Sequence, residues 1–248
     1  MPSALSPAQL AALYDLENQW AADDDFFLAF VNEQANQRVL DLGCGTGRIS
    51  LAVAAHGHTV VGIDPNPDSL SAARNKPGAE NIIWIEGTSA HIPKDQVFDV
   101  AVMTAHVAQA IYDDGEWSRT LADVHRALAP GGLLSFDSRD PSARAWERWT
   151  PENTSTTYTL PDGSDVDSWK ESSLDPDVDG LVVLTEHRSR QGGPAETETS
   201  VLAFRSEQQL RHDLSTAGFW VDDIFGGWSG ESVGNGQGEL IVLARKPA

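Results

Sequence analysis

The sequence predicts an α/β protein with a doubly wound, mostly parallel sheet of seven strands and a small antiparallel sheet inserted late in the chain. Short, almost continuously apolar runs alternate with amphipathic segments between residues 37 and 140, which is typical of parallel strands covered by helices on both faces. After Trp149 this alternation gives way to a segment rich in Thr, Ser, Asp and Gly, where turn signals separate short strand-like runs. The first pattern returns after residue 205.

The N-terminal part is predicted to be helical. Apolar residues recur at helical spacing through residues 6–34, and the acidic run Asp23–Asp25 suits the first turn of a second helix. From residue 37 onward each apolar run is followed by a helical segment. Five strands are expected, at 37–42, 58–63, 82–85, 97–103 and 133–137. The motif Pro130-Gly131-Gly132 is expected to end the helix that precedes the fifth strand.

The later part of the chain predicts the inserted sheet and then the end of the main one. The strand-like runs of the insertion are 156–160, 166–169, 181–185 and 201–204. A capping box at Ser206–Gln209 starts a helix that ends at Gly218, and strands at 219–225 and 239–244 complete the main sheet. The predicted organisation is N-terminal helices at 1–36, an α/β core at 37–149 and 206–248, and an antiparallel insertion at 150–205. The insertion is expected to be a substrate lid or a dimer interface.

Size and composition limit the classes of function. A chain of 248 residues with 40% hydrophobic residues can bury one sizeable core. The 17 basic residues are outnumbered by 37 acidic ones, for a formal charge of −20, which argues against nucleic acid as a partner because phosphate recognition relies on clustered Lys and Arg. With one cysteine, no signal-like start and no membrane-length apolar run, we expect a soluble, cytoplasmic protein without a membrane partner.

The most informative stretch runs from Val39 to Arg48. An apolar strand enters a loop with glycine at every second position, and a helix opens directly after it. Glycine lets such a loop turn sharply and lets a ligand approach main-chain atoms. The next predicted strand ends in Asp64, where a carboxylate commonly accepts hydrogen bonds from the ribose of an adenosine-containing cofactor.

The glycine spacing distinguishes between cofactors. A nicotinamide-binding loop would have its third glycine at the position of Arg48, whereas here the third glycine is Gly47. The resulting pattern, Asp-x-Gly-x-Gly-x-Gly from Asp41, resembles motif I of the class I methyltransferases that use S-adenosylmethionine (SAM). The segment Leu128–Gly132, with the pattern Leu-x-Pro-Gly-Gly before a strand, is similar to another hallmark of that family.

The resemblance implies roles for a set of cofactor-binding residues. In the family, the main chain of the glycine loop contacts the methionyl part of SAM, the first acidic residue supports the loop and the amino group, and the second acidic residue binds the ribose. N-terminal helices often fold an aromatic residue over the cofactor, for which Tyr14 and Trp20 are candidates, although both could simply pack on the core. At the place of the usual adenine-binding Asp this chain has Thr88, followed by Ser89, which leaves adenine recognition open. The expected cofactor-binding residues are Tyr14, Asp41, Gly43, Gly45, Gly47, Asp64, Pro65, Thr88, Ser89 and Met103.

The loop after the fourth strand is expected to pass the methyl group that is transferred. His106 is its best-placed titratable residue and is the candidate general base, although it could instead pack or bind the cofactor. After the fifth strand, Asp137 could orient an amine or hydroxyl acceptor, with Trp146 or Trp149 as a pocket wall, or the region could be a solvated helix entrance. The histidines lack the spacing of a metal site, so no metal is expected.

These observations predict a SAM-dependent methyltransferase that acts on nitrogen or oxygen of a small molecule, with a homodimer as a candidate assembly. Methyl transfer needs mostly alignment in a dry pocket, so the lack of an obvious nucleophile does not count against it. One alternative is a non-catalytic SAM-binding or interaction protein, which Thr88 in place of the usual acid would suit. A nucleotide-dependent oxidoreductase is a second alternative, disfavoured by Arg48.

Overall fold

The computed structural model describes residues 4–178, 180–190 and 193–248. Its main sheet has seven strands in the order β10-β11-β5-β4-β1-β2-β3, and all neighbouring pairs are parallel except those that involve β11. The doubly wound fold class is therefore confirmed. The strands are β1 (Arg38–Leu42), β2 (Thr59–Asp64), β3 (Ile82–Glu86), β4 (Phe98–Met103), β5 (Leu128–Arg139), β10 (Trp220–Phe225) and β11 (Glu239–Arg245).

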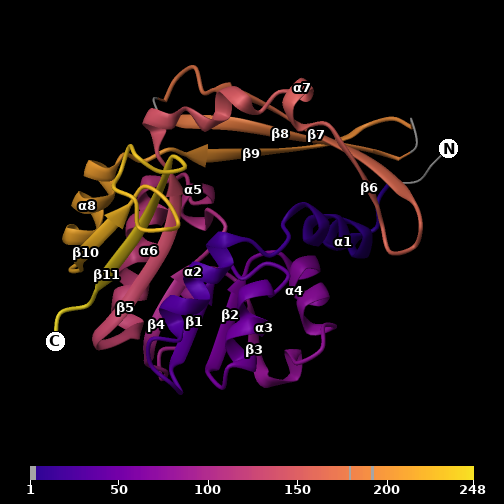
Figure 1. Cartoon of the computed structure of the whole chain (residues 1–248). Coiled ribbons are helices and arrows are strands. Elements are labelled where there is room, and N and C mark those ends of the chain that lie inside the picture. Colours follow the sequence, from indigo (N-terminus) through magenta and orange to yellow (C-terminus); the bar gives the residue numbers. More distant parts are fainter. Residues whose placement is uncertain (1–3, 179, 191–192) are drawn as a thin grey trace.

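Helices cover both faces of this sheet (Figure 1). Ser6 and Ser206 cap the helices α1 and α8 with full capping boxes, the second of which the sequence predicts. The helices are α1 (Pro7–Glu17), α2 (Ala22–Val31), α3 (Arg48–Ala55), α4 (Pro67–Arg74), α5 (Val107–Ala110), α6 (Asp114–Ala127), α7 (Pro151–Thr154) and α8 (Glu207–Thr216). Short 3₁₀ turns are η1 (Ala79–Asn81), η2 (Ser89–His91), η3 (Pro141–Ala143) and η4 (Ala145–Arg148).

The strand β5 begins earlier than the sequence predicts. Helix α6 ends at Ala127, but β5 starts at Leu128 and passes through the Pro-Gly-Gly motif, where Gly131 has a φ of +78°. Its pairing with β4 shifts register across this motif. The motif thus ends the helix as expected and also forms an irregular first part of the strand, which sequence patterns do not separate from a loop.

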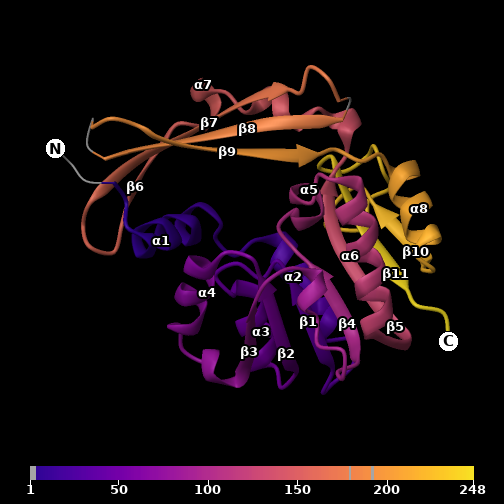
Figure 2. The same cartoon turned by 180° about the vertical axis from the view of Figure 1, so that it is seen from behind.

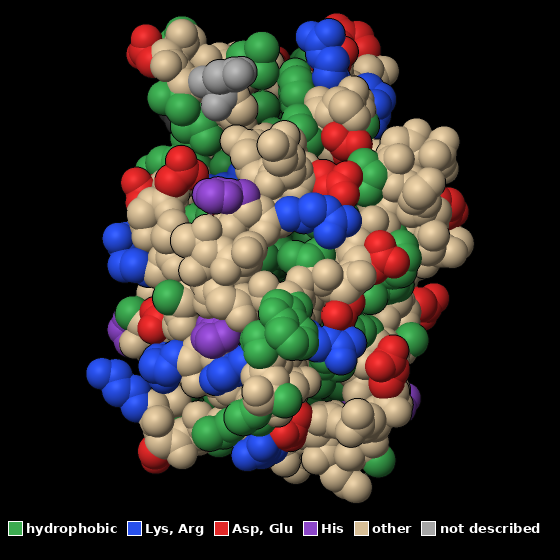
Figure 3. All heavy atoms as spheres, turned by 90° about the vertical axis from the view of Figure 1, so that its left-hand side faces the viewer, with side chains coloured by type: hydrophobic (Ala, Val, Ile, Leu, Met, Phe, Trp, Pro, Cys, Tyr) green, Lys and Arg blue, Asp and Glu red, His purple; other side chains and the backbone are tan. Residues whose placement is uncertain are grey.

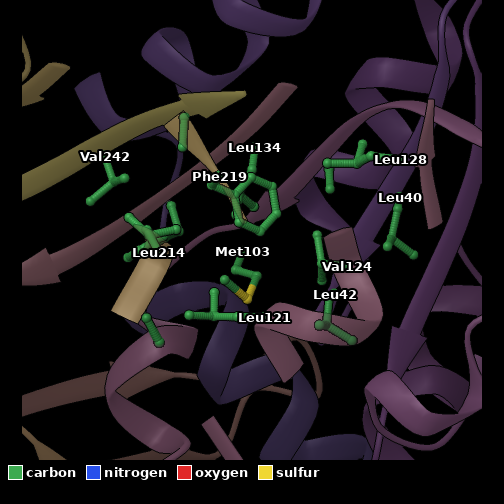
Figure 4. Close-up of a cluster of buried hydrophobic side chains, with 14 of the residues drawn as sticks. Leu40, Leu42, Met103, Leu121, Val124, Leu128, Leu134, Leu214, Phe219 and Val242 are labelled. Atoms are coloured by element: carbon green, nitrogen blue, oxygen red, sulfur yellow. The ribbon is translucent and has the colours of Figure 1, made fainter. Parts of the chain in front are cut away.

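The core lies on both faces of the main sheet. On one face, side chains of β1, β4, β5 and β11 pack against α6 and α8 (Figure 4), and Trp117 of α6 meets Phe136 of β5 edge to face at 5.6 Å between ring centroids. On the other face, α2 and α3 pack around Phe27 and Val39, with Trp228 nearby. The inner parallel strands β1, β2 and β4 are thus buried on both sides, as their continuous apolar runs predict, whereas the edge strand β3 is partly exposed.

A second, antiparallel sheet lies across one end of the main sheet (Figures 1 and 2). Its strands, in spatial order, are β6 (Thr156–Thr159), β7 (Asp165–Leu174), β8 (Leu181–Arg190) and β9 (Glu196–Ala203). They fall within the segment in which the sequence predicts an inserted sheet, and the last three are longer than expected. The chain enters this inserted segment after Arg139, the last residue of β5, and leaves it after Ala203, the last residue of β9. The second sheet therefore lies next to the C-terminal end of β5.

Helix α1 connects the second sheet to the main domain. Leu5 and Leu13 pack with Leu160 and Val166 of the second sheet, and Ser168 of β7 donates a 2.6 Å hydrogen bond to Glu17. The opposite side of α1 lies against α4. The N-terminal helix is therefore held between the two sheets.

The surface at the β10 edge shows how the negative charge is distributed. Acidic and basic side chains are interspersed on this side of the molecule, with hydrophobic side chains between them (Figure 3). The net charge of −20 thus does not form a field of one sign on this face.

In the described parts of the chain no helix is both long enough and apolar enough to cross a lipid bilayer.

The packing of α1 generates a stability prediction. Leu13 is fully buried, so Leu13→Ala should lower the free energy of unfolding by about 2–5 kcal/mol because it leaves a cavity. Urea denaturation followed by circular dichroism measures this loss. Ile83→Ala is the control, because Ile83 is 48% exposed and should cost little. An equal effect of both variants would show that α1 is not packed as described.

Candidate active site

The glycine loop between β1 and α3 has the conformation that its sequence requires. Gly43, Gly45 and Gly47 all have positive φ, at +81°, +52° and +83°. A side chain at Gly47 would place its Cβ 2.6 Å from Trp84, whereas a Cβ at Gly45 would meet nothing within 4 Å. The middle of the loop therefore borders open space, where a ligand can approach the main chain.

Asp64, at the end of β2, holds this loop. One carboxylate oxygen accepts a 2.8 Å hydrogen bond from the backbone N–H of Gly45, and the other accepts one of 2.8 Å from Asn66. Burial raises the pKa of Asp64, and these two hydrogen bonds oppose that effect. Each oxygen keeps a further lone pair. Pro65 follows; it is exposed and precedes Asn66, the N-cap of α4.

Asp41 lies below the loop and contacts α3. Its Oδ2 accepts a 2.6 Å hydrogen bond from Ser50, while its Oδ1 is buried without a partner. Burial raises the pKa of Asp41 to about 6, and the Ser50 bond partly offsets the shift. The direct loop contact that the family resemblance implies for Asp41 is thus made by Asp64. A buried acceptor without a protein donor is unusual, so Oδ1 of Asp41 is a candidate acceptor for a donor of the cofactor.

Helix α1 approaches the loop from above. Asp15 accepts a 2.6 Å hydrogen bond from the Thr46 hydroxyl of the loop and forms a 2.7 Å ion pair with Lys76. Tyr14 is 40% exposed as a whole residue. The pKa of its hydroxyl is nevertheless raised, mainly because the hydroxyl is partly desolvated. The charge of Arg48 opposes this shift and the charge of Asp64 adds to it. Tyr14 is therefore close to the charges of the cofactor loop. Trp20, the other aromatic candidate, donates to Asp25 of α2 instead.

Two expected cofactor ligands have side chains that face elsewhere. The Ser89 hydroxyl lies 3.3 Å from that of Thr120 and 3.2 Å from Asp123, both on α6. Met103 is fully buried in the core beside Leu121 (Figure 4). Only the backbone of these two residues can face a ligand, whereas Thr88 is exposed.

His106 contacts two carboxylates at the C-terminal ends of β4 and β5. Its Nε2 lies 2.9 Å from Oε2 of Glu239 and 3.3 Å from Oδ2 of Asp137, and its backbone N–H donates to the same Asp137 oxygen at 3.0 Å. Ala105 and His106 both have left-handed backbones, with φ of +56° and +63°, a conformation that costs energy outside glycine. These interactions hold the imidazole in one orientation.

Glu239 is a site residue that the sequence reasoning missed, because it is the first residue of the last strand. Since β11 is antiparallel to β5, its first residue lies at the edge where β5 ends, opposite Arg139. Asp137 is fully buried; burial raises its pKa and His106 opposes the shift. One atom from each of His106, Asp137 and Glu239 lies within 4.8 Å of the others. In the described residues this cluster can hold either a shared proton or a divalent cation.

Arg139, the last residue of β5, lies beside the cluster. Its guanidinium donates a 2.9 Å hydrogen bond to Gln109 and stacks over Trp149, with 5.1 Å to the ring centroid. Asp137 and Arg139 share one face of β5, because side chains alternate along a strand. The two acids, the histidine and the arginine therefore form one polar group at the end of the main sheet.

A glycine loop after β1, an acid at the end of β2 and a mostly parallel sheet with an antiparallel β11 define a doubly wound, nucleotide-binding α/β fold. Residues 39–132 match the family model described as a methyltransferase domain. The chain is 25% identical to the cypemycin N-terminal methyltransferase of a Streptomyces species, over 99% of this chain and 98% of that protein. Two further curated relatives are matched over only 52% and 41% of their lengths.

Solved structures share the whole fold. The CcbJ methyltransferase of Streptomyces caelestis superposes with a TM-score of 0.78 at 20% identity, covering 98% of both chains. SAM-bound CalS10, an amino pentose methyltransferase of Micromonospora echinaspora, gives 0.69 at 18% identity, covering 99% of this chain and all of the other. These solved structures show that the chain shares their fold, and residues 39–132 match a methyltransferase domain within it.

The buried Asp41 generates a pH-dependent stability prediction. Because its pKa is raised to about 6, the folded state holds a proton that the unfolded state has released, so this residue lowers stability as the pH rises from 4 to above 6. Asp41→Asn removes that dependence. Between pH 5 and pH 8 the wild type should lose about 1 kcal/mol relative to the variant, measured by urea denaturation without cofactor. A constant difference between the two proteins across this range would contradict the assignment.

Proposed function

We propose that this methyltransferase transfers the methyl group of SAM to an amine nitrogen of a small molecule. The observation that carries the proposal is the His106–Asp137–Glu239 cluster. An alkyl amine is protonated near neutral pH, so two carboxylates favour its approach and the imidazole can take its proton before attack. Two of the proteins similar to this chain have names that specify methylation at nitrogen, an N-terminal methyltransferase and a sugar N-methyltransferase.

The residues around the glycine loop suit SAM. We assign the ribose hydroxyls to Asp64, the amino group to the unpartnered oxygen of Asp41, and the methionyl part to the main chain of Gly43 and Gly45. Tyr14 and Thr88 are the side chains we assign to the rest of the nucleoside, beside Gly47 and Pro65. When bound, SAM supplies a methyl group that is already activated on a sulfonium, so the protein's task is alignment in a site without water.

His106 is proposed as the base that accepts the proton of the amine. A carboxylate that accepts from Nε2–H leaves Nδ1 as the acceptor, so the contact of 2.9 Å with Glu239 selects the tautomer. Asp137 holds the His106 backbone in its left-handed conformation and stabilises the imidazolium that forms. The proton thus has a defined destination, and the free amine can attack the methyl carbon.

The second sheet, which covers this end of the main sheet, is proposed as the wall that closes the acceptor site; a dimer interface at the same surface stays a prediction.

We also propose a cytoplasmic location. The single cysteine, Cys44, is buried, and burial raises the pKa of its thiol, so the chain has no internal disulfide that would favour an oxidising compartment.

The cofactor assignment is tested by calorimetric titration with SAM. Asp64→Ala should weaken binding by about 1–3 kcal/mol, or about 5–150-fold, because charge-assisted hydrogen bonds to the ribose and to Gly45 are lost. Asp64→Asn, which keeps one acceptor oxygen, should lose less. The control is Asp68→Ala on the exposed side of α4. Equal SAM affinity in wild type and Asp64→Ala would remove Asp64 from the site.

The base is tested by turnover of a panel of small primary amines and their matched alcohols, followed by release of S-adenosylhomocysteine. His106→Asn should lower kcat by about 10²–10⁴-fold with SAM affinity unchanged, and Glu239→Gln should lower kcat less and change its pH profile. His56→Asn, at the exposed end of α3, is the control. A kcat within a few-fold of wild type would exclude His106 as the base, and loss of wild-type activity in EDTA would show that the cluster holds a metal ion.

A further inference from the structure

Arg139 has fewer hydrogen-bond partners than a structural arginine in the same protein. Arg205 is 5% exposed and stacks over Trp117 at 4.8 Å. Its guanidinium donates to the carbonyls of Ala108 and Ile111 and to Asp114, at 2.9–3.2 Å. Arg139 also stacks over a tryptophan, but the Gln109 amide is its one hydrogen-bond acceptor among the described residues.

The nearest acids do not neutralise Arg139. In the described parts of the chain no carboxylate lies within 4.0 Å of its guanidinium nitrogens. Glu239 is directly opposite Arg139 across the two strands, but its carboxylate contacts His106 instead. Burial lowers the pKa of Arg139, and the more distant Glu239 and Asp137 oppose that shift. A guanidinium has five N–H donors, so most of the donors of Arg139 are free for a ligand.

The surroundings of Arg139 fix the plane of these free donors. Gln109 is fully buried, and its amide nitrogen lies 3.5 Å from the carbonyl of Ala203, so its oxygen faces Arg139. The indole of Trp149 lies against the guanidinium face. A planar cation held on its face and at one N–H is suited to bind a carboxylate edge-on through the remaining N–H groups.

We propose that Arg139 binds a carboxylate of the methyl acceptor, so that the acceptor is an amino acid-like molecule with its amine close to a carboxylate. This inference rests on the proposed function, because it takes the cluster beside Arg139 as the amine site. Arg139 and Glu239 are paired residues of adjacent strands, a separation that a few covalent bonds span. A singly charged carboxylate suits the position better than a phosphate, since Asp137 and Glu239 repel a dianion.

The direct test observes the Nε–H signal of Arg139 by NMR in protein loaded with S-adenosylhomocysteine. The signal is assigned by its absence in Arg139→Lys. Acetate should shift it saturably, while acetamide, which has the same shape without the charge, should not. Arg144→Met, which removes a 59% exposed arginine five residues away, should leave the acetate response unchanged. No response to acetate, or an equal response to acetamide, would overturn the proposal.

A second test measures turnover of a panel of small amino acids. Each one is offered with its free carboxylate and, for comparison, as its carboxamide. Wild type should show a KM at least about tenfold lower for the carboxylate form. Arg139→Met should abolish this difference and Arg139→Lys should keep part of it, while the affinity for S-adenosylhomocysteine stays unchanged. Weaker cofactor binding in both variants would show that Arg139 serves the cofactor instead. If the wild type does not bind S-adenosylhomocysteine at all, the proposed function fails, whereas binding without a carboxylate preference sinks this inference alone.

Discussion

The hydrogen bond from the backbone N–H of Gly45 to the Asp64 carboxylate organises the cofactor end of this protein. It joins the loop after β1 to the end of β2, so that two separate strands present one binding surface. The loop can accept this contact because three of its residues have positive φ, which only glycine adopts at little cost. With the loop held in this way, the Thr46 hydroxyl faces Asp15 of α1, and the N-terminal helix gains an attachment point above the site.

Helix α1 in turn relates the cofactor loop to the second sheet. One side of the helix contacts the loop and α4, and the other packs its apolar residues against β6 and β7. A change in the position of the second sheet would therefore reach the cofactor loop through a packed helix. This arrangement gives the second sheet and the cofactor loop a common packed neighbour in α1.

The acceptor end relies on a different principle. Four charged or titratable side chains converge at the ends of β4, β5 and β11: His106, Asp137, Arg139 and Glu239. Two carboxylates contact the imidazole, and the guanidinium of Arg139 lies beside them as the opposite charge. In the proposed function this group binds an ammonium and removes its proton, and we infer that Arg139 binds an anion beside it. The chemistry of methyl transfer itself needs little more than this alignment.

The sequence by itself determined the α/β fold, the glycine loop and the acids Asp41 and Asp64, because strand and loop patterns are local and the motif lies within one βαβ unit. It also selected His106 from its place after a strand. Only the tertiary structure decided which atoms meet. Glu239 lies 133 residues from His106 and reaches it through the antiparallel pairing of β11, which no local pattern predicts. The side chains of Ser89 and Met103 turn toward α6 and the core because long-range packing decides orientation, and the pairing of Arg139 depends on the same non-local contacts.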